Sequence, residues 1–204
     1  MPKNANRSLT ITTKGSDLAD APALAALAVI QGDITTVQAD AIVNAANSAL
    51  AGGGGVDGAI HAAAGPTVLE QCRVLIDQEG PCATGSAVVT SAGNLPAKWI
   101  IHTVGPIWEQ HGPAQNAALL GDCYTSSLAA ASDIGATSIG FSAISTGVYG
   151  FPKELAAPIA VSAVVTWLEE NFHHTTVQSV TLVCFDDVNF QLTRQAADNL
   201  EHRN

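Results

Sequence analysis

Short hydrophobic runs alternate with longer segments of helical periodicity through most of the chain, from residue 24 onward. Many of the short runs are rich in β-branched residues and are apolar at nearly every position, which is typical of strands covered on both faces. They predict strands at 27–31, 41–44, 86–91, 99–104, 138–143 and 180–185. A further short strand is expected at 9–13, between a frayed start over residues 1–8 and a loop at 15–22.

The longer segments predict helices, and glycine or proline residues mark where several of them begin or end. The expected helices cover 56–64, 66–77, 114–134, 153–171 and 189–201. Strands that alternate with helices indicate an α/β fold. We therefore expect a three-layer α/β/α sandwich around a central mixed, largely parallel sheet of about six or seven strands, in one domain over residues 1–204.

The charge balance of the chain narrows the range of partners. Lys and Arg total 8 against 18 Asp and Glu, for a net charge of −10. Such a balance repels nucleic acid and anionic membranes, so neither is an expected partner. Since the apolar stretch at 21–30 is interrupted after ten residues, no run reaches membrane-spanning length, and a soluble protein is expected.

The four cysteines are not spaced as in a metal-binding motif. Cys72, Cys82, Cys123 and Cys184 lie far apart, with no CxxC pair, in a chain that shows no secretory leader. Reduced thiols and a cytoplasmic location are the expectation. Neither a metal nor a cofactor is implied.

Two glycine-rich loops are the main candidates for ligand binding. One is 52–55, four consecutive glycines between the strand ending AIVNAAN and the helix at 56–64, and the other is 145–150, STGVYG, which follows the strand at 138–143. In open α/β sheets, ligands bind at the carboxyl ends of strands, and backbone amides free of Cβ atoms can hold a phosphate there. One glycine loop alone could serve only a tight turn, but two in equivalent places predict a clamp for a pyrophosphate.

Neither loop matches a common nucleotide-binding signature. A P-loop requires Lys and then Ser or Thr after its last glycine, whereas Gly55 is followed by Val56 and Asp57. The glycine run fits the dinucleotide fingerprint only loosely. Kinases, NTPases and hydride-transfer enzymes are therefore disfavoured.

Six segments in order resemble the macrodomain family, and within it the MacroD-type ADP-ribose hydrolases, which include O-acetyl-ADP-ribose deacetylases. They are GDIT at 32–35, AIVNAAN at 41–47, GGGGVDGAIHAAAG at 52–65, ATG at 83–85, LPAKWIIHTVGP at 95–106 and SAISTGVYGFP at 142–152. The match extends over about 27–187. The resemblance implies the same sandwich with ADP-ribose in a cleft at the strand ends. Two departures are Ala62, where relatives often carry a basic residue, and the lack of the Cys and His insertion of the zinc-bearing branch.

The resemblance assigns ligand contacts to particular residues. Asp33 is expected to accept hydrogen bonds from the adenine amino group beside Ile34, and Phe185 is expected to lie against adenine. From the residues alone, Asp33 could equally be a helix N-cap and Phe185 a core residue. The loops expected to enclose the diphosphate contribute Gly53, Gly54, Gly55, Val56, Ser145, Thr146, Gly147, Val148 and Tyr149, with Tyr149 close to the distal ribose.

Asp57 and Asn47 are the expected catalytic residues. An acid in the first helical turn could serve only the helix dipole, but Asp57 matches the family's catalytic aspartate. It either deprotonates a water or binds ribose hydroxyls so that a substrate phosphate positions the water. Asn44 is expected in the ligand site in a supporting role, or in an Asx turn. His61 and His102 are expected to be packed core histidines.

These residues indicate a hydrolase that acts on esters of the distal ribose. It would remove mono-ADP-ribose from acidic side chains of proteins and deacetylate O-acetyl-ADP-ribose, without a cofactor. The expected partners are therefore ADP-ribose, O-acetyl-ADP-ribose and mono-ADP-ribosylated proteins. The alternative is a module that binds ADP-ribose without turnover.

Overall fold

One mixed β-sheet forms the centre of the molecule. The computed structural model describes residues 8–11 and 26–201, and in this part of the chain seven strands pair in the order β1-β2-β7-β6-β3-β5-β4. The strands are β1 (Ser8–Ile11), β2 (Ala26–Gln31), β3 (Ala41–Ala46), β4 (Ala87–Ser91), β5 (Trp99–Val104), β6 (Ser138–Ser142) and β7 (Ser179–Cys184). The five inner strands run parallel, while β1 and β4 at the edges are antiparallel to their neighbours. The expected mixed, largely parallel sheet is confirmed.

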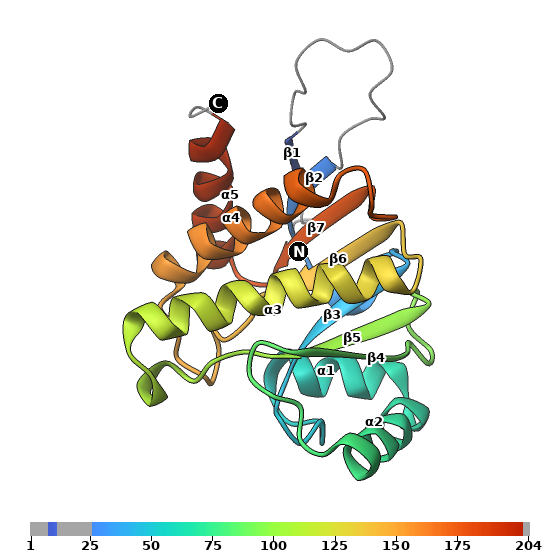
Figure 1. Ribbon diagram of the computed structural model, residues 1–204. Coiled ribbons are helices and arrows are strands. Elements are labelled where there is room, and N and C mark those ends of the chain that lie inside the picture. The colour runs from blue at the N-terminus through green and yellow to red at the C-terminus, as the bar shows by residue number, and fades with distance from the viewer. Residues whose placement is uncertain (1–7, 12–25, 202–204) are drawn as a thin grey trace, which may run out of the picture.

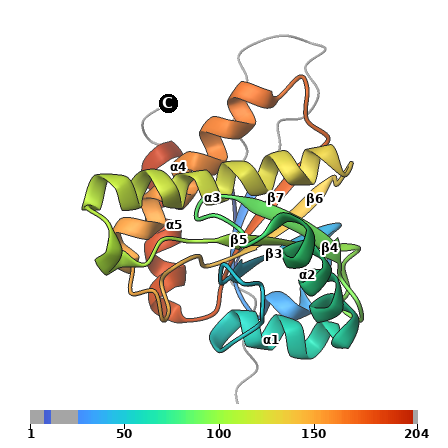
Figure 2. The same ribbon diagram turned by 60° about the horizontal axis from the view of Figure 1, so that its bottom comes forward.

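Helices cover both faces of this sheet. They are α1 (Gly55–Ala64), α2 (Pro66–Glu79), α3 (Pro113–Asp133), α4 (Lys153–Asn171) and α5 (Asp187–Glu201), with short 3-10 turns η1 (Ile34–Thr36) and η2 (Trp108–Gln110). Helices α3, α4 and α5 lie on one face and α1 and α2 on the other (Figures 1 and 2). The three-layer α/β/α sandwich is therefore confirmed. The frayed start predicted at 1–8 is wrong for Ser8, which begins β1. Residues 1–7, the predicted loop at 15–22 and the last two residues of the strand at 9–13 lie outside the described residues.

The strands are hydrophobic at nearly every position because each face of the sheet buries its own core. In β3, Ala41 and Val43 pack into the core beneath α3, α4 and α5, while Ile42 and Ala46 pack into the core beneath α1 and α2. Successive side chains of a strand point to opposite faces. Both sets must therefore be apolar when both faces are covered.

The junction between α1 and α2 shows how glycine and proline set the boundaries of helices. Gly65 has a φ of 84°, which L-residues with a Cβ rarely adopt, and its amide donates to the carbonyl of His61 at 3.1 Å. Pro66 then begins α2 at a position where no amide hydrogen is needed. These two residues therefore end α1 at Ala64 and begin α2 at Pro66.

All four cysteines are buried and form no disulfide. Burial raises the pKa of the Cys72, Cys123 and Cys184 thiols to about 11, and it also raises the pKa of Cys82. The thiols therefore stay protonated and pack as small apolar groups.

Within residues 8–11 and 26–201, none of the helices combines the length and the apolar character needed to cross a bilayer.

Candidate active site

A cleft of about 670 Å³ opens where β2, β3, β6 and β7 reach their carboxyl ends. Its volume is within the usual range for small-molecule sites. The cleft brings together fourteen of the fifteen residues predicted for the site: Asp33, Ile34, Asn47, Gly53, Gly54, Gly55, Val56, Asp57, Ser145, Thr146, Gly147, Val148, Tyr149 and Phe185.

Asn44 is the exception, because the structure does not place it on the cleft surface. It lies on β3, is fully buried, and does not line the cleft. Its Nδ2 atom instead donates to Oδ1 of Asp57 at 2.7 Å, beneath the cleft wall. The alternative, an Asx turn at this position, is wrong, because the strand continues through Asn44 to Ala46. The supporting role is consistent with this contact.

Asp57 is a buried carboxylate that is held from two sides. It lies in the first turn of α1 and is 6% exposed. Asn44 donates to Oδ1, and Nδ2 of Asn47 donates to Oδ2 at 3.3 Å. Nε2 of His61, one helical turn further on, lies 3.4 Å from Oδ1. These contacts fix the plane of the carboxylate, and Oδ2, which has a single donor, keeps a lone pair that a ligand could use.

Asn47 also shapes the first glycine loop. Its Nδ2 atom donates to the carbonyl of Gly52 at 2.8 Å, and its Oδ1 accepts from the amide of Ala51 at 3.3 Å. Gly52 and Gly55 have φ values of 72° and 61°, a region that L-residues rarely adopt. One side chain therefore ties the glycine loop to the carboxylate of Asp57.

The second loop is held at both ends by the backbone. The amide of Phe151 donates to the carbonyl of Ser145 at 3.0 Å, and the carbonyl of Tyr149 accepts from the amide of Trp108 at 2.9 Å. Ser145 has a φ of 61°, and its buried Oγ has no partner in the described part of the chain. Burial and the charge of Asp57 raise the pKa of Tyr149, so its phenol stays protonated and can donate a hydrogen bond.

The far end of the cleft carries Asp33 and Phe185. Asp33 caps η1, since its Oδ1 accepts from the amide and hydroxyl of Thr35 at 2.9 and 2.8 Å. The N-cap interpretation and a place in the cleft are thus both correct. Phe185 follows β7 and is 80% exposed, so the alternative of a core residue is wrong.

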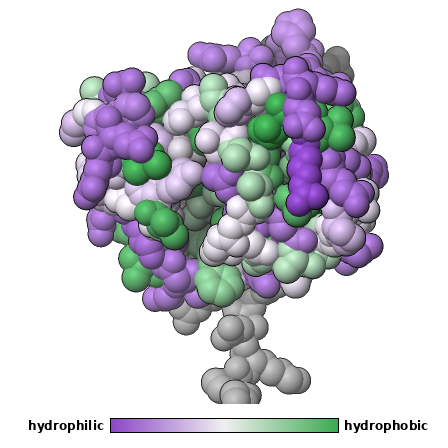
Figure 3. Space-filling view, turned by 90° about the horizontal axis from the view of Figure 1, so that it is seen from below, coloured by the Kyte–Doolittle hydropathy of each residue, from purple (hydrophilic) through white to green (hydrophobic). Residues whose placement is uncertain are grey.

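The cleft carries two strongly exposed apolar side chains. Seen from below, the molecule shows small hydrophobic patches dispersed among hydrophilic ones (Figure 3). Among the large hydrophobic side chains that the structure describes as exposed, Val148 at 92% and Phe185 at 80% are the most exposed, and both line the cleft. Such side chains fit the flat faces of a base or sugar.

Sequence reasoning missed several residues that line the cleft: Gly32, Ala45, Ala46, Ala59, Gly105, Ser142, Ala143, Lys153, Val183, Asp186 and Asn189. Asp186 accepts from Nζ of Lys153 and from Nδ2 of Asn189, each at 2.9 Å. No local motif marks these three polar residues, because α4 and α5 bring them together only in the folded chain. Gly105 had a signal, since it comes directly after a predicted strand in the segment IIHTVGP.

Comparison with known proteins agrees with this geometry. The Macro domain family matches residues 43–160. A protein of Escherichia fergusonii named O-acetyl-ADP-ribose deacetylase is 53% identical over 164 residues, which cover 80% of this chain and 90% of that protein. A macro domain-containing protein of Listeria monocytogenes is 52% identical over 166 residues, or 81% and 93% of the two chains.

Solved structures show the same fold. The macrodomain of Oceanobacillus iheyensis with ADP superposes with a TM-score of 0.86 at 37% identity, over 97% of this chain and 100% of that one. The Trypanosoma brucei macrodomain in complex with ADP-ribose superposes with a TM-score of 0.74 at 40% identity, over 83% and 68%. The chain belongs to the Macro domain family.

Proposed function

We propose that the protein hydrolyses esters of the distal ribose of ADP-ribose. In this proposal it deacetylates O-acetyl-ADP-ribose and removes mono-ADP-ribose from acidic side chains of proteins. The observation that carries the proposal is the buried carboxylate of Asp57 in the cleft wall, between two loops suited to bind phosphate. A carboxylate repels a neighbouring diphosphate, so its presence beside the two loops favours a role in the reaction over a role in holding the phosphates. The name of the 53% identical relative supports the same chemistry.

The cleft suggests how such a substrate would lie. The amides of the loops at 52–55 and 145–150 would hold the diphosphate. Adenine would lie beside Phe185, with its amino group donating to Oδ2 of Asp33, the oxygen not used in capping η1. The distal ribose would then lie beside Asp57 and Tyr149. ADP in the Oceanobacillus iheyensis macrodomain and ADP-ribose in the Trypanosoma brucei macrodomain support this class of ligand.

The reaction is the addition of water to an ester. Water attacks the acyl carbon, the bond between that carbon and the ribose oxygen breaks, and the products are a carboxylic acid and ADP-ribose. Asp57 either accepts the proton of the water or holds the ribose hydroxyls, as the two donors Asn44 and Asn47 keep its carboxylate fixed. General-base assistance contributes roughly 10²- to 10⁴-fold to a rate. The buried, unbridged thiols favour a reducing compartment, and we propose the cytoplasm.

The test compares the parent protein with Asp57→Ala and Asp57→Asn. Asp77→Ala, at an exposed position on α2, is the matched control. Release of acetate from O-acetyl-ADP-ribose and of ADP-ribose from a glutamate-modified protein is followed, and ADP-ribose binding is measured by calorimetry. We expect both Asp57 variants to lose about 10²-fold or more in kcat, whereas the control keeps parental rates.

Two outcomes would contradict the proposal. Tight ADP-ribose binding by the parent without release of product would identify a non-catalytic ADP-ribose reader, the alternative function. Parental turnover in Asp57→Ala would show that hydrolysis does not depend on this carboxylate.

A further inference from the structure

A row of buried polar side chains crosses the sheet beneath the cleft. It runs from Thr90 on β4 through His102 on β5 and Asn44 on β3 to Asp57 on α1, and their exposed fractions are 4%, 0%, 0% and 6%. The apolar core beneath α1 and α2 surrounds this row, with Ile42 and Ile100 beside it on the same strands. Buried polar groups destabilise a core unless they are hydrogen-bonded. The contacts along the row therefore need an explanation.

The direction of each hydrogen bond in the row follows from simple chemistry. The carboxylate of Asp57 only accepts, so Asn44 must present its Nδ2 atom to it, at 2.7 Å. The same Nδ2 atom lies 3.1 Å from Nδ1 of His102, which must then be the unprotonated ring nitrogen. The ring proton is on Nε2, which lies 2.9 Å from Oγ1 of Thr90. Thr90 can accept it because its own hydroxyl donates to the carbonyl of Ser91 at 3.0 Å.

The row holds the amide of Asn44 in one orientation. Burial, and to a lesser extent His61, lowers the pKa of His102 to about 3, so the ring is neutral and Nδ1 keeps its lone pair. Oδ1 of Asn44 is buried and has no partner among the described residues. The orientation of the amide therefore does not satisfy its own oxygen. The amide is thus oriented to satisfy its two neighbours, His102 and Asp57.

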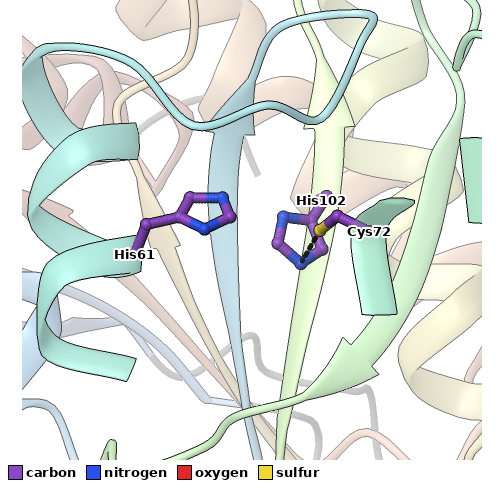
Figure 4. A group of neighbouring side chains, drawn as sticks. All are labelled: His61, Cys72 and His102. Carbon is purple, nitrogen blue, oxygen red and sulfur yellow. Dashed lines mark hydrogen bonds between the residues drawn. The ribbon is translucent and has the colours of Figure 1, made fainter. Parts of the chain in front are cut away.

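A metal site is the other interpretation of this region. His61 on α1 and Cys72 on α2 lie on opposite sides of His102, and one potential ligand atom from each of the three lies within 4.8 Å of the others (Figure 4). Two observations disfavour a metal. Both ring nitrogens of His102 already have partners, Asn44 and Thr90. The thiol of Cys72, with a pKa raised to about 11 by burial, is not a thiolate near neutral pH.

We propose that His102 and Thr90 are positioning residues for Asp57, and that they act through the amide of Asn44. This inference rests on the proposed function, in which Asp57 contacts the substrate or the attacking water. The neutral ring of His102 accepts one hydrogen of the Asn44 amide, and this directs the other amide hydrogen at Oδ1 of Asp57. Without that acceptor the amide is free to rotate, and the carboxylate loses its fixed orientation. Displacement of a reacting group by about 1 Å can lower a rate about 10²-fold.

Two substitutions at one position separate this role from packing. His102→Asn places an amide oxygen near the position of Nδ1 and can accept from Asn44, whereas His102→Gln reaches only the position of Nε2. We expect kcat to fall about 10- to 100-fold in His102→Gln and to stay within about 3-fold of the parent in His102→Asn. The Kd for ADP-ribose should change little in either variant. Thr90→Val should lower kcat, and Thr90→Ser should restore it.

Cys72→Ala is the control for disturbance of the same core. Its sulfur contacts Nε2 of His102 at 3.8 Å, the hydrogen bond drawn in Figure 4, but the thiol does not touch Asn44 or Nδ1, the side of the ring that faces Asp57. We expect parental kcat in this variant. A loss equal to that of His102→Gln would overturn the proposal, since packing alone would then explain both.

A spectroscopic measurement tests the inference without reference to turnover. Nitrogen NMR of the ¹⁵N-labelled full chain at pH 7 should show His102 as the neutral tautomer with its proton on Nε2. Equimolar Zn²⁺ should leave the chemical shifts of both ring nitrogens of His102 unchanged. A proton on Nδ1, or a shift on addition of Zn²⁺, would overturn it. If the parent shows no hydrolysis but His102 has the expected tautomer, the proposed function fails. If Asp57→Ala abolishes hydrolysis but His102→Gln does not slow it, only the positioning role fails.

Discussion

A side chain on Gly105 would overlap Oγ of Ser145, so the two residues approach as closely as glycine allows. Gly105 follows β5, and Ser145 begins the loop that closes the cleft. The same added Cβ would also lie 2.6 Å from Cγ2 of Ile144. The position of the second loop therefore depends on a glycine that follows β5, far from this loop in the sequence.

Gly105→Ala should displace this loop and weaken ADP-ribose binding by about 10-fold or more, since overpacking typically costs about 1–3 kcal/mol. Calorimetry with ADP-ribose measures the change in Kd. Gly121→Ala, in α3 with no neighbour within 4 Å of the added Cβ, is the control. It should keep the parental Kd and raise the free energy of unfolding by up to about 1 kcal/mol, because alanine favours the helix. An unchanged Kd in Gly105→Ala would contradict the expected collision.

Gly58→Ala should damage the first loop even though it improves helix propensity. The added Cβ would overlap the carbonyl oxygen of Gly53. The helix or the loop must then move, which displaces Asp57 or the glycine amides. We expect both a lower kcat with O-acetyl-ADP-ribose and a lower melting temperature. A variant as stable and active as the parent would show that the loop adjusts without loss.

Phe185→Ala should weaken binding without slowing catalysis. Stacking of a base on an aromatic ring is worth about 1–3 kcal/mol, which predicts a Kd for ADP-ribose roughly 5- to 100-fold higher. At saturating substrate kcat should be close to parental, since Asp57 is untouched. Val188→Ala, which removes a half-exposed apolar side chain nearby on α5 but outside the cleft, is the control. A large fall in kcat in Phe185→Ala would indicate that this ring also positions the reacting end.

Protonation of His102 should destabilise the fold in acid. Burial lowers its pKa from 6.5 to about 3, so below pH 6.5 the unfolded chain binds a proton that the folded chain does not. The stabilisation is complete above pH 6.5 and is lost as the pH falls toward 3. One proton gives a slope of at most about 1.4 kcal/mol per pH unit.

Urea unfolding between pH 7.5 and 4 measures this slope. The groups around the ring are His61, Cys72 and, through Asn44, Asp57, so the comparison is made with His102→Asn, which removes only the titrating ring. The slope should be smaller in this variant than in the parent. His174→Asn, at an exposed position, controls for the loss of a histidine. Equal slopes in the parent and His102→Asn would contradict a neutral, buried ring.

Local pattern predicted most of the fold because the inner strands are buried on both faces and glycine or proline marks an end of several helices. The strand at 27–31 and the helix at 153–171 lie within or match β2 and α4. Helix α5 begins at Asp187, two residues before the predicted start, with the side chain of Asp186 accepting from the amide of Asn189 at 2.9 Å. Nothing in this short polar segment distinguishes a loop from a first helical turn.

The glycine loops and Asp57 were predictable because they are continuous in sequence, whereas the support beneath them was not. Asn44 and His102 are paired in register on neighbouring parallel strands, 58 residues apart in the chain. Which face of each strand they occupy depends on the register of the sheet. Both strands are hydrophobic at nearly every position, so the sequence does not show which face a single Asn or His occupies or which residue it contacts.

The buried thiols allow local opening of the two helix layers to be measured without an engineered probe. Cys72 and Cys82 lie in the core beneath α1 and α2, Cys123 and Cys184 lie in the core beneath α3, α4 and α5, and each has a raised pKa. An alkylating reagent requires an accessible thiolate, so the folded protein offers it almost none. Labelling therefore requires each layer to open first, and mass spectrometry of the labelled peptides separates opening over α2 from opening over α3. The same shielding protects the protein from mild oxidants for as long as it stays folded.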